Sequence, residues 1–315
     1  MNNLTGDFIL EMMTLYAIGV LGLFARKKGV LKKHTTEVLT QLILYITLPA
    51  LILFSLDISF SFTIVNQFIW LVFMSILAMS IAIIISAWMG NRSNLPEHQR
   101  KVYKSLTIFG NQGFIGYAVI YILFHEQGIV YLTIFNIYYL ILIWTYGIYL
   151  FTKDSNTINW KNIYFNPGIL STIAGLIILF TPLTLPNTIA SSLESIGKMT
   201  IPLSMLVIGC LIADTQIKNI FMMLKNSYIW KSAFVKLLLT PLLLLPLYFL
   251  SVPFPLFATA IIVSGMPSAP TISLYAQKFG GDCYYASIGV LVTTFFCIFT
   301  IPILYFIVQL LYRYY

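Results

Sequence analysis

Two clusters of polar and helix-weakening residues lie inside runs that are otherwise almost entirely apolar. The first is FGNQGFIGYAV, residues 109–119, which sets Asn111 and Gln112 among three glycines. The second is SGMPSAPTISLYAQ, residues 264–277, which contains two prolines. Proline has no amide hydrogen and clashes with the preceding turn, so a continuous helix is disfavoured. Freed backbone amides, side-chain amides and hydroxyls are groups that bind a polar or anionic ligand.

The elements that carry these clusters are predicted membrane spans. Of the 315 residues, 59% are hydrophobic and only 9% are charged, which is too little charge for the surface of a soluble protein. A helix that crosses about 30 Å of hydrocarbon needs roughly 20 apolar residues. Long continuous apolar runs favour helices over a transmembrane β-barrel. The predicted spans are 7–25, 38–56, 64–89, 102–124, 129–151, 163–181, 194–213, 228–250, 254–277 and 283–311.

The basic residues predict the orientation of these ten spans. If the N-terminus is outside, most lysines and arginines fall in cytosolic loops, as the positive-inside rule requires. Both termini are therefore expected on the extracytoplasmic side of the cell membrane. The N-terminus has acidic residues and no basic n-region, so the first span is expected to be retained. We interpret the net charge of +8 as the loop charge that orients the spans in the membrane. We therefore expect the lipid bilayer rather than nucleic acid as a partner.

A weak internal repeat divides the chain. Gly110 and Phe124 recur 155 residues later as Gly265 and Phe279. Because each predicted half has five spans, the second half must enter the membrane inverted relative to the first. The predicted segments are a first five-helix repeat at 1–152, a short cytosolic linker at 153–162 and a second repeat at 163–315. Interrupted spans at matching positions of two repeats indicate a transport site.

The predicted site is an anion site where the two breaks cross. A new helix start suits a carboxylate, and the end of the preceding helix suits a cation. The candidate substrate contacts are Asn111, Gln112, Gly113, Asn136, Ser204, Pro267, Ser268, Pro270 and Thr271. The alternative for each polar residue taken alone is a hydrogen bond that only holds neighbouring helices together.

Other chemistries find little support. The cysteines lack metal-ligand spacing, the histidines fall in predicted loops, and no carboxylate lies clearly at mid-depth. We therefore expect no metal, no cofactor and no enzyme. Lys198 is expected to pair with Glu194 on a helix surface. Lys236 is expected to extend its stem toward the cytosolic headgroups, with a role in coupling as the alternative.

Several phrases of the chain resemble the auxin efflux carrier family. They are NQGFIGYAVIYILF, GIVYLTIFNI, WTYG, TLPALILFSL, TIPLSMLVIG and MPSAPTISLYAQKFGGD. Bacterial, malate-permease-like members show N-x-G-F-x-G-Y-P in span four, and this chain has Ala118 in place of that proline. The resemblance implies an all-α fold like that of sodium/bile acid symporters, with ten helices in two inverted repeats and crossing broken helices 4 and 9. Spans 1, 2, 6 and 7 would then form a scaffold, the other spans a moving core, and two chains a homodimer.

The resemblance also implies a class of substrate. Plant members export auxin, and bacterial members are commonly described as malate or malonate permeases, so both groups handle carboxylate anions. We expect a secondary transporter, most simply an exporter, of small organic carboxylates by alternating access at the crossing of helices 4 and 9. The alternatives are a cation-coupled symporter of an organic anion or bile-acid-like solute, an integral membrane enzyme acting on lipid-linked substrates, and a sensor. The sensor would need a soluble output domain, for which the loops leave no room.

Overall fold

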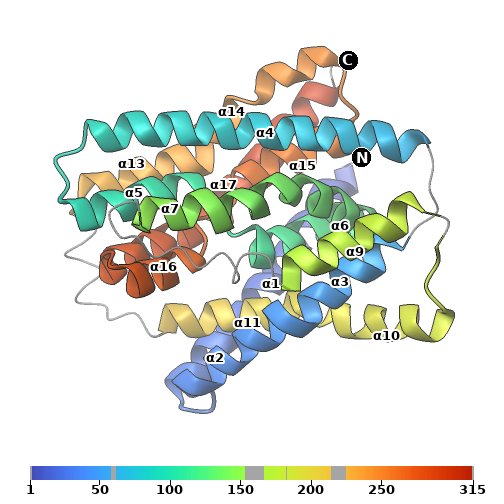
Figure 1. Cartoon of the computed structure of the whole chain (residues 1–315), viewed down its shortest axis with the longest axis horizontal. Coiled ribbons are helices and arrows are strands. Elements are labelled where there is room, and N and C mark those ends of the chain that lie inside the picture. Colours follow the sequence, from blue (N-terminus) through green and yellow to red (C-terminus); the bar gives the residue numbers. More distant parts are fainter. Residues whose placement is uncertain (1, 58–61, 153–166, 182, 214–224, 314–315) are drawn as a thin grey trace. The chain divides into compact units, whose positions relative to one another are not determined.

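The computed structural model describes residues 2–57, 62–152, 167–181, 183–213 and 225–313. The regular elements of these ranges are helices (Figure 1). Six of the helices are long and apolar enough to cross a membrane, and two shorter apolar helices span Pro167–Phe180 and Phe254–Ser264. The predicted all-helical integral membrane protein is therefore confirmed. The count of ten spans and the inverted repeat stay predictions.

The elements follow one another with few irregular residues between them. In chain order they are α1 (Asn2–Lys27), α2 (Lys33–Leu42), η1 (Ile43–Thr47), α3 (Leu48–Leu56), α4 (Phe62–Asn91), α5 (Glu97–Ile108), η2 (Gln112–Gly116), α6 (Tyr117–Leu142), η3 (Ile143–Gly147), α7 (Ile148–Thr152), α9 (Pro167–Phe180), α10 (Asn187–Lys198), α11 (Thr200–Ala213), α13 (Ser227–Phe234), η4 (Val235–Leu239), α14 (Thr240–Leu242), η5 (Leu245–Leu250), α15 (Phe254–Ser264), α16 (Thr271–Phe279) and α17 (Cys283–Arg313). The elements η1 to η4 are π-helical turns and η5 is a 3₁₀-helix. Inside α6, His125 has non-helical backbone angles, at the predicted boundary between spans four and five.

The chain forms two compact units that interleave along the sequence. Unit 1 consists of Met1–Phe68, Gly113–Ile134 and Trp160–Asp214. Unit 2 consists of Ile69–Gln112, Phe135–Asn159 and Thr215–Tyr315. Unit 1 contains the four spans that the family resemblance assigns to a scaffold, and unit 2 contains most of the spans assigned to a moving core. The exceptions are residues 64–68 and 113–134, which belong to unit 1.

Unit 1 is built on close approaches between helices. Helix α1 packs along α11, and α3 packs against α9 and α10. A Cβ on Gly209 would clash with the backbone oxygen of Gly19 and lie 2.8 Å from the nitrogen of Leu23. The next residue of α11 adds a hydrogen bond, because the thiol of Cys210 donates to the carbonyl of Gly22 at 3.5 Å. Small residues let the two backbones touch, as in many membrane helix pairs.

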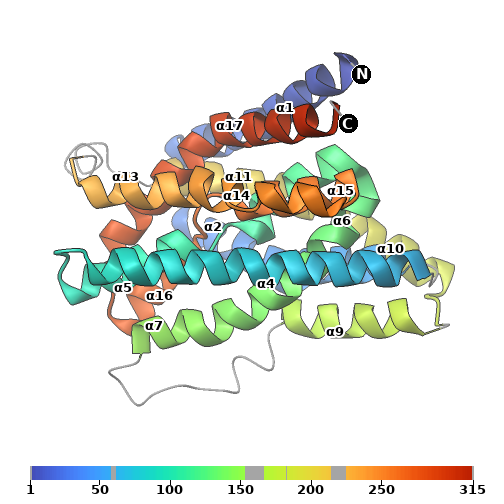
Figure 2. The same ribbon diagram turned by 90° about the horizontal axis from the view of Figure 1, so that it is seen from above.

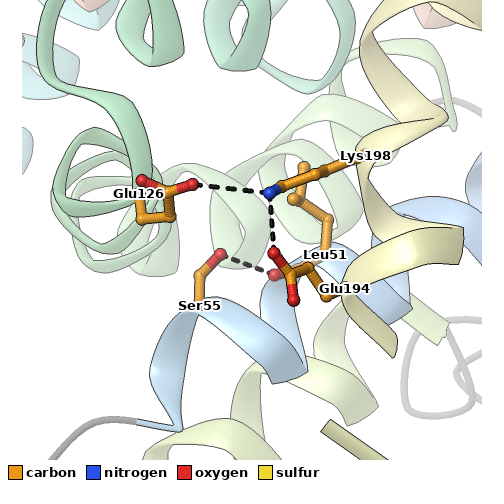
Figure 3. A network of polar contacts seen from close by, with 5 residues as sticks. All are labelled: Leu51, Ser55, Glu126, Glu194 and Lys198. Carbon is orange, nitrogen blue, oxygen red and sulfur yellow. Dashed lines mark hydrogen bonds and ion pairs between the residues drawn. The ribbon is translucent and has the colours of Figure 1, made fainter. Parts of the chain in front are cut away.

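An exposed ion-pair network lies in unit 1 (Figure 3). Lys198 Nζ donates to Glu194 Oε1 at 2.7 Å, which confirms the predicted pair. Glu126 Oε1 also lies 3.7 Å from the same nitrogen. The Lys198 side chain is 45% exposed, so solvent screening keeps these pairs weak. The network is best explained as a surface feature.

Unit 2 is organised around the last long helix. Helix α17 packs against α5, α13, α15 and α16, and α16 also packs against α7. Helix α4 is one long helix with α5 beside its end (Figure 2). The hydroxyl of Ser86 on α4 donates to the Lys104 carbonyl of α5 at 3.0 Å. Ser75, earlier in α4, donates to the Phe135 carbonyl at 2.6 Å. Two buried hydroxyls, those of Ser75 and Ser86, therefore fix α4 to its neighbours.

Contacts between residues far apart in the sequence join segments that the predicted alternation of spans places on the same side of the membrane. On the predicted cytosolic side the contacts are Gln99 with Asp282 at 2.9 Å, Asn94 with Tyr228 at 3.0 Å and Lys101 with Phe151 at 3.3 Å. On the other side they are Leu185 with Asp57 at 3.2 Å, Lys198 with Glu126 at 3.7 Å, and Tyr312 with Val252. The assignment of these contacts to sides of the membrane rests on the predicted spans and remains a prediction.

Candidate functional site

The first predicted cluster interrupts its helix at Phe109–Asn111. Helix α5 ends at Ile108, and Phe109 is extended with φ −91° and ψ 118°. The chain then enters the π-helical turn η2, which contains Gly113, and continues as α6. The break therefore lies just before Gly113 rather than on it. Ala118, where relatives usually have proline, lies within α6 and is fully buried.

The second cluster interrupts its helix between α15 and α16. Helix α15 ends at Ser264, and α16 begins at Thr271 with Pro270 as its N-cap residue. Pro267 has no N–H with which to continue the helix. The N–H of Ser268 donates to the hydroxyl of Thr293 at 3.0 Å instead of to the carbonyl one turn earlier. The prolines thus produce the extended backbone that their spacing predicts.

The two breaks pair with each other through their backbones. The N–H of Asn111 donates to the Pro267 carbonyl at 2.6 Å, and the N–H of Ala269 donates to the Phe109 carbonyl at 3.0 Å. Gly110 and Ser268 form an isolated antiparallel bridge between these bonds. All of these residues belong to unit 2. Each break satisfies backbone groups of the other, which is a condition for extended backbone at membrane depth.

Hydroxyl groups fix the crossing to neighbouring helices. Ser268 Oγ donates to the Leu106 carbonyl at 2.7 Å, and Tyr139 Oη donates to the Gly110 carbonyl at 2.7 Å. Both side chains are buried. Ser268 therefore already uses its donor within the protein. This bond holds the second break against α5, and the Ser268 oxygen can still accept a hydrogen bond.

Three buried side-chain amides accompany the crossing. Asn111 is 3% exposed and follows the bridge directly, and Gln112 is 1% exposed. Asn136 is 4% exposed and lies one turn before Tyr139, on the same face of α6 that contacts Gly110. Among the described residues, Gln112 Oε1 and Asn136 Oδ1 have no hydrogen-bond partner. An amide presents either its oxygen or its NH₂ group when it rotates, so these groups suit a polar ligand.

The other predicted site residues are placed less directly. Gly113 begins the unit 1 segment Gly113–Ile134, directly after Gln112 of unit 2. Thr271 is the first residue of α16. Ser204 lies on α11 in unit 1, and its buried hydroxyl donates to the Thr200 carbonyl at 2.6 Å. The structure therefore joins Asn111, Pro267 and Ser268 in one contact. These three residues belong to unit 2, whereas Ser204 belongs to unit 1.

Lys236 is a residue of the site that the sequence analysis misplaced. It was expected to reach the headgroups, but only 2% of its surface is exposed, so that prediction is wrong. Its Nζ donates to the Ile108 carbonyl at 3.2 Å and to the Ser264 carbonyl at 3.1 Å. These are the last residues of α5 and α15, where each helix breaks. The available signal was an ionisable residue inside a predicted span, which by default marks a functional site.

The charge on Lys236 has no carboxylate partner among the described residues. The ion pairs recorded there involve His34 and Lys198 as the cations. The same part of the chain contains no group of three or more metal-ligating side chains. The site therefore combines one buried ammonium, two helix ends, several hydroxyls and several amides.

Comparison with known proteins identifies the family of the chain. The family profile described as "Membrane transport protein" matches residues 7–305. An uncharacterised transporter of Methanocaldococcus jannaschii, MJ1031, is 23% identical over 219 residues, which cover 67% of this chain and 70% of that protein. The match to the family covers both breaks, Asn136 and Lys236. The chain therefore belongs to the auxin efflux carrier family of membrane transport proteins.

Proposed function

We propose that this membrane transporter carries small organic carboxylate anions by alternating access, with the substrate bound beside the crossing of α5–η2 and α15–α16. The observation that carries the proposal is a buried ammonium at the crossing of two broken helices, with no carboxylate of the described residues paired to it. Because no carboxylate of the described residues pairs with the ammonium, an anion meets no such like-charged partner there.

The helix ends at the crossing add to this preference. The C-termini of α5 and α15 each have a partial negative charge of about half an elementary unit, and Lys236 neutralises both. The N-terminus of α16 begins on the other side of the second break and has the opposite partial charge. With the negative ends compensated, the remaining field favours an anion.

The amides supply contacts that orient a carboxylate. Asn111 and Gln112 adjoin the first break, and Asn136 lies on the helix face that contacts it. Amide NH₂ groups donate to carboxylate oxygens without adding charge, which suits a ligand that must also leave. Gly113, Pro270 and Thr271 keep their proposed roles as backbone or hydroxyl contacts beside these amides. Ser204 keeps its proposed role as a substrate contact.

The pattern of helix contacts supports an inverted repeat. In unit 1 the first predicted span contacts the seventh (α1 with α11), and the second contacts the sixth (α3 with α9). In unit 2 the fourth contacts the tenth (α5 with α17), and the fifth contacts the ninth (α7 with α16). Exchanging the two five-span halves converts each contact into its mate. A repeat of this kind lets one site open to either side of the membrane in turn.

The proposal also includes the direction of transport, the oligomeric state and the exclusion of an enzyme. An interior-negative potential drives anions outward with about 2.3 kcal/mol per charge per 100 mV, so we propose export. We also propose a homodimer in the cell membrane with both termini outside. An enzyme acting on lipid-linked substrates would need a cluster of acids or histidines at a membrane face, and the described residues hold no such metal-ligating group.

The decisive experiment is counterflow in proteoliposomes with labelled malate, malonate and indole-3-acetate. At least one of these carboxylates should exchange through the wild-type protein. Asn111→Ala should abolish the exchange, while Asn66→Ala, which changes an exposed asparagine of α4, should leave it intact. Expression and oligomeric state should be equal in both variants. If Asn111→Ala exchanges the anion as wild type does, the proposed binding site is wrong. If wild type exchanges none of the three anions, the proposed substrate class is wrong.

A further inference from the structure

Lys236 binds the carbonyl groups that the two breaks leave without helical partners. In a continuous helix the Ser264 carbonyl would accept the N–H of Ser268. That N–H donates instead to Thr293 Oγ1. The Ile108 carbonyl loses its helical partner in the same way, because the chain leaves the helix at Phe109. One ammonium group, at 3.2 Å and 3.1 Å, therefore caps the C-termini of both broken helices.

The position of this ammonium is one that suits a metal cation. Unwound carbonyls and half-helix C-termini are the groups that coordinate coupling cations in carriers with broken helices. Here the space between them is filled by a side chain of the protein. A Cβ on Gly110 would lie 3.1 Å from the Lys236 Nζ, which is tight, so the glycine of the first break leaves room for the ammonium.

We propose that Lys236 is the built-in cation of the crossing. Its ammonium takes the place of an alkali-metal ion between the two helix ends, so that transport proceeds without a coupling metal cation. This inference rests on the proposed function, and it separates a carboxylate carrier of this kind from a metal-coupled symporter. Lys236 acts through the two breaks that it holds, and it is therefore a positioning residue.

If Lys236 were purely structural, its variants would respond differently to added cations. Replacing a buried charge with an apolar side chain is often neutral or even stabilising, so a change in thermal stability alone is not diagnostic. The informative readout is whether a small cation supplied from outside replaces the ammonium. In Lys236→Ala the side chain beyond Cβ is removed, which leaves space for a short alkylammonium ion.

The first experiment measures the melting temperature of the full-length protein in lipid nanodiscs at constant ionic strength. We expect Lys236→Ala to melt lower than wild type, and n-propylammonium to restore most of the loss in a saturable manner. Tetramethylammonium, which has the charge but no N–H donors, should not restore it. Sodium should raise the melting temperature of Lys236→Ala and leave that of wild type unchanged.

Two further variants serve as controls. Lys236→Met fills the space of the stem without a charge, so it should not respond to n-propylammonium or sodium. Lys198→Ala removes an exposed lysine of unit 1 and should show no response either. A saturable sodium effect on wild type would overturn the proposal, and so would the absence of an n-propylammonium effect on a folded Lys236→Ala.

The second experiment keeps the inference testable if Lys236→Ala does not fold. Malate flux through wild-type protein is measured in four buffers of equal ionic strength, whose cation is sodium, lithium, potassium or choline. We expect rates within about twofold of one another, and a tenfold loss in choline would contradict a built-in cation. If wild type moves no carboxylate at all, the proposed function fails, while the melting experiments still decide the role of Lys236.

Discussion

The backbone N–H of Asn111 donates to the carbonyl of Pro267, 2.6 Å away, and so joins two segments 156 positions apart in the chain. Neither segment could keep its extended backbone alone, because an unsatisfied polar group in hydrocarbon costs several kcal/mol. Pro267 interrupts its own helix and at the same time supplies the acceptor for the other break. The two interruptions are therefore one structural feature, and a change in either one affects both.

Tyr139→Phe should weaken this feature without removing bulk. The lost hydrogen bond from Tyr139 Oη to the Gly110 carbonyl leaves a buried acceptor unsatisfied, so we expect a loss of about 0.5–1.5 kcal/mol of stability. Carboxylate flux should fall with it, because Gly110 is part of the backbone bridge. Chemical denaturation in mixed micelles and counterflow measure the two effects. Tyr149→Phe, at a tyrosine that is 49% exposed, is the matched control and should behave as wild type.

Gly209→Ala should destabilise unit 1. The added methyl group would clash with the Gly19 backbone, which cannot move as a side chain end can, so overpacking of about 1–3 kcal/mol is expected. Gly113→Ala has no atom within 4 Å of the new Cβ and should leave the melting temperature nearly unchanged. Differential scanning fluorimetry of both variants compares them. Equal melting temperatures would contradict the close packing of α1 on α11.

The breaks were predictable because their causes are local. Proline has no amide hydrogen wherever it stands, so SGMPSAP alone predicts the end of α15 and the start of α16 within a few residues. The first break was predicted only as a stretch, residues 109–119. The chain unwinds at the start of that stretch, at Phe109–Asn111, where Pro267 and Ala269 supply backbone partners. Both partners lie in the other half of the chain, so the sequence around the first break does not reveal them.

The environment of Lys236 was not predictable for the same reason. Its distance along the helix from the cytosolic end allowed the side chain to reach the headgroups. Burial instead depends on two carbonyl groups from α5 and α15, which become available only after both helices break. The pair of Lys198 with Glu194 was predicted correctly because residues four apart on a helix are neighbours without tertiary structure.

Cys283 provides a direct test of orientation. It is exposed at the start of α17, whereas Cys210 and Cys297 are buried, so the wild-type chain is in effect a single-site reporter. The positive-inside pattern places this thiol in the cytosol. A membrane-impermeant maleimide should therefore label inside-out vesicles and leave intact cells unlabelled. Cys283→Ser identifies the signal, and labelling of intact cells would reverse the topology.

Gln112→Glu tests the sign of the charge that the site accepts. The substitution keeps the shape of a side chain that is 1% exposed and adds a negative charge beside the first break. If the substrate is a carboxylate, repulsion from the ionised glutamate should raise its KM at least tenfold. The buried charge should also lower the melting temperature, so the KM is measured at a temperature at which the variant is folded. Protonation of the new glutamate removes the charge, so activity should return as the pH falls. Gln112→Asn, which stays neutral, should lack this pH dependence. A variant whose KM for malate is unchanged across the pH range would place the substrate away from Gln112, because two negative groups in contact cannot bind without cost.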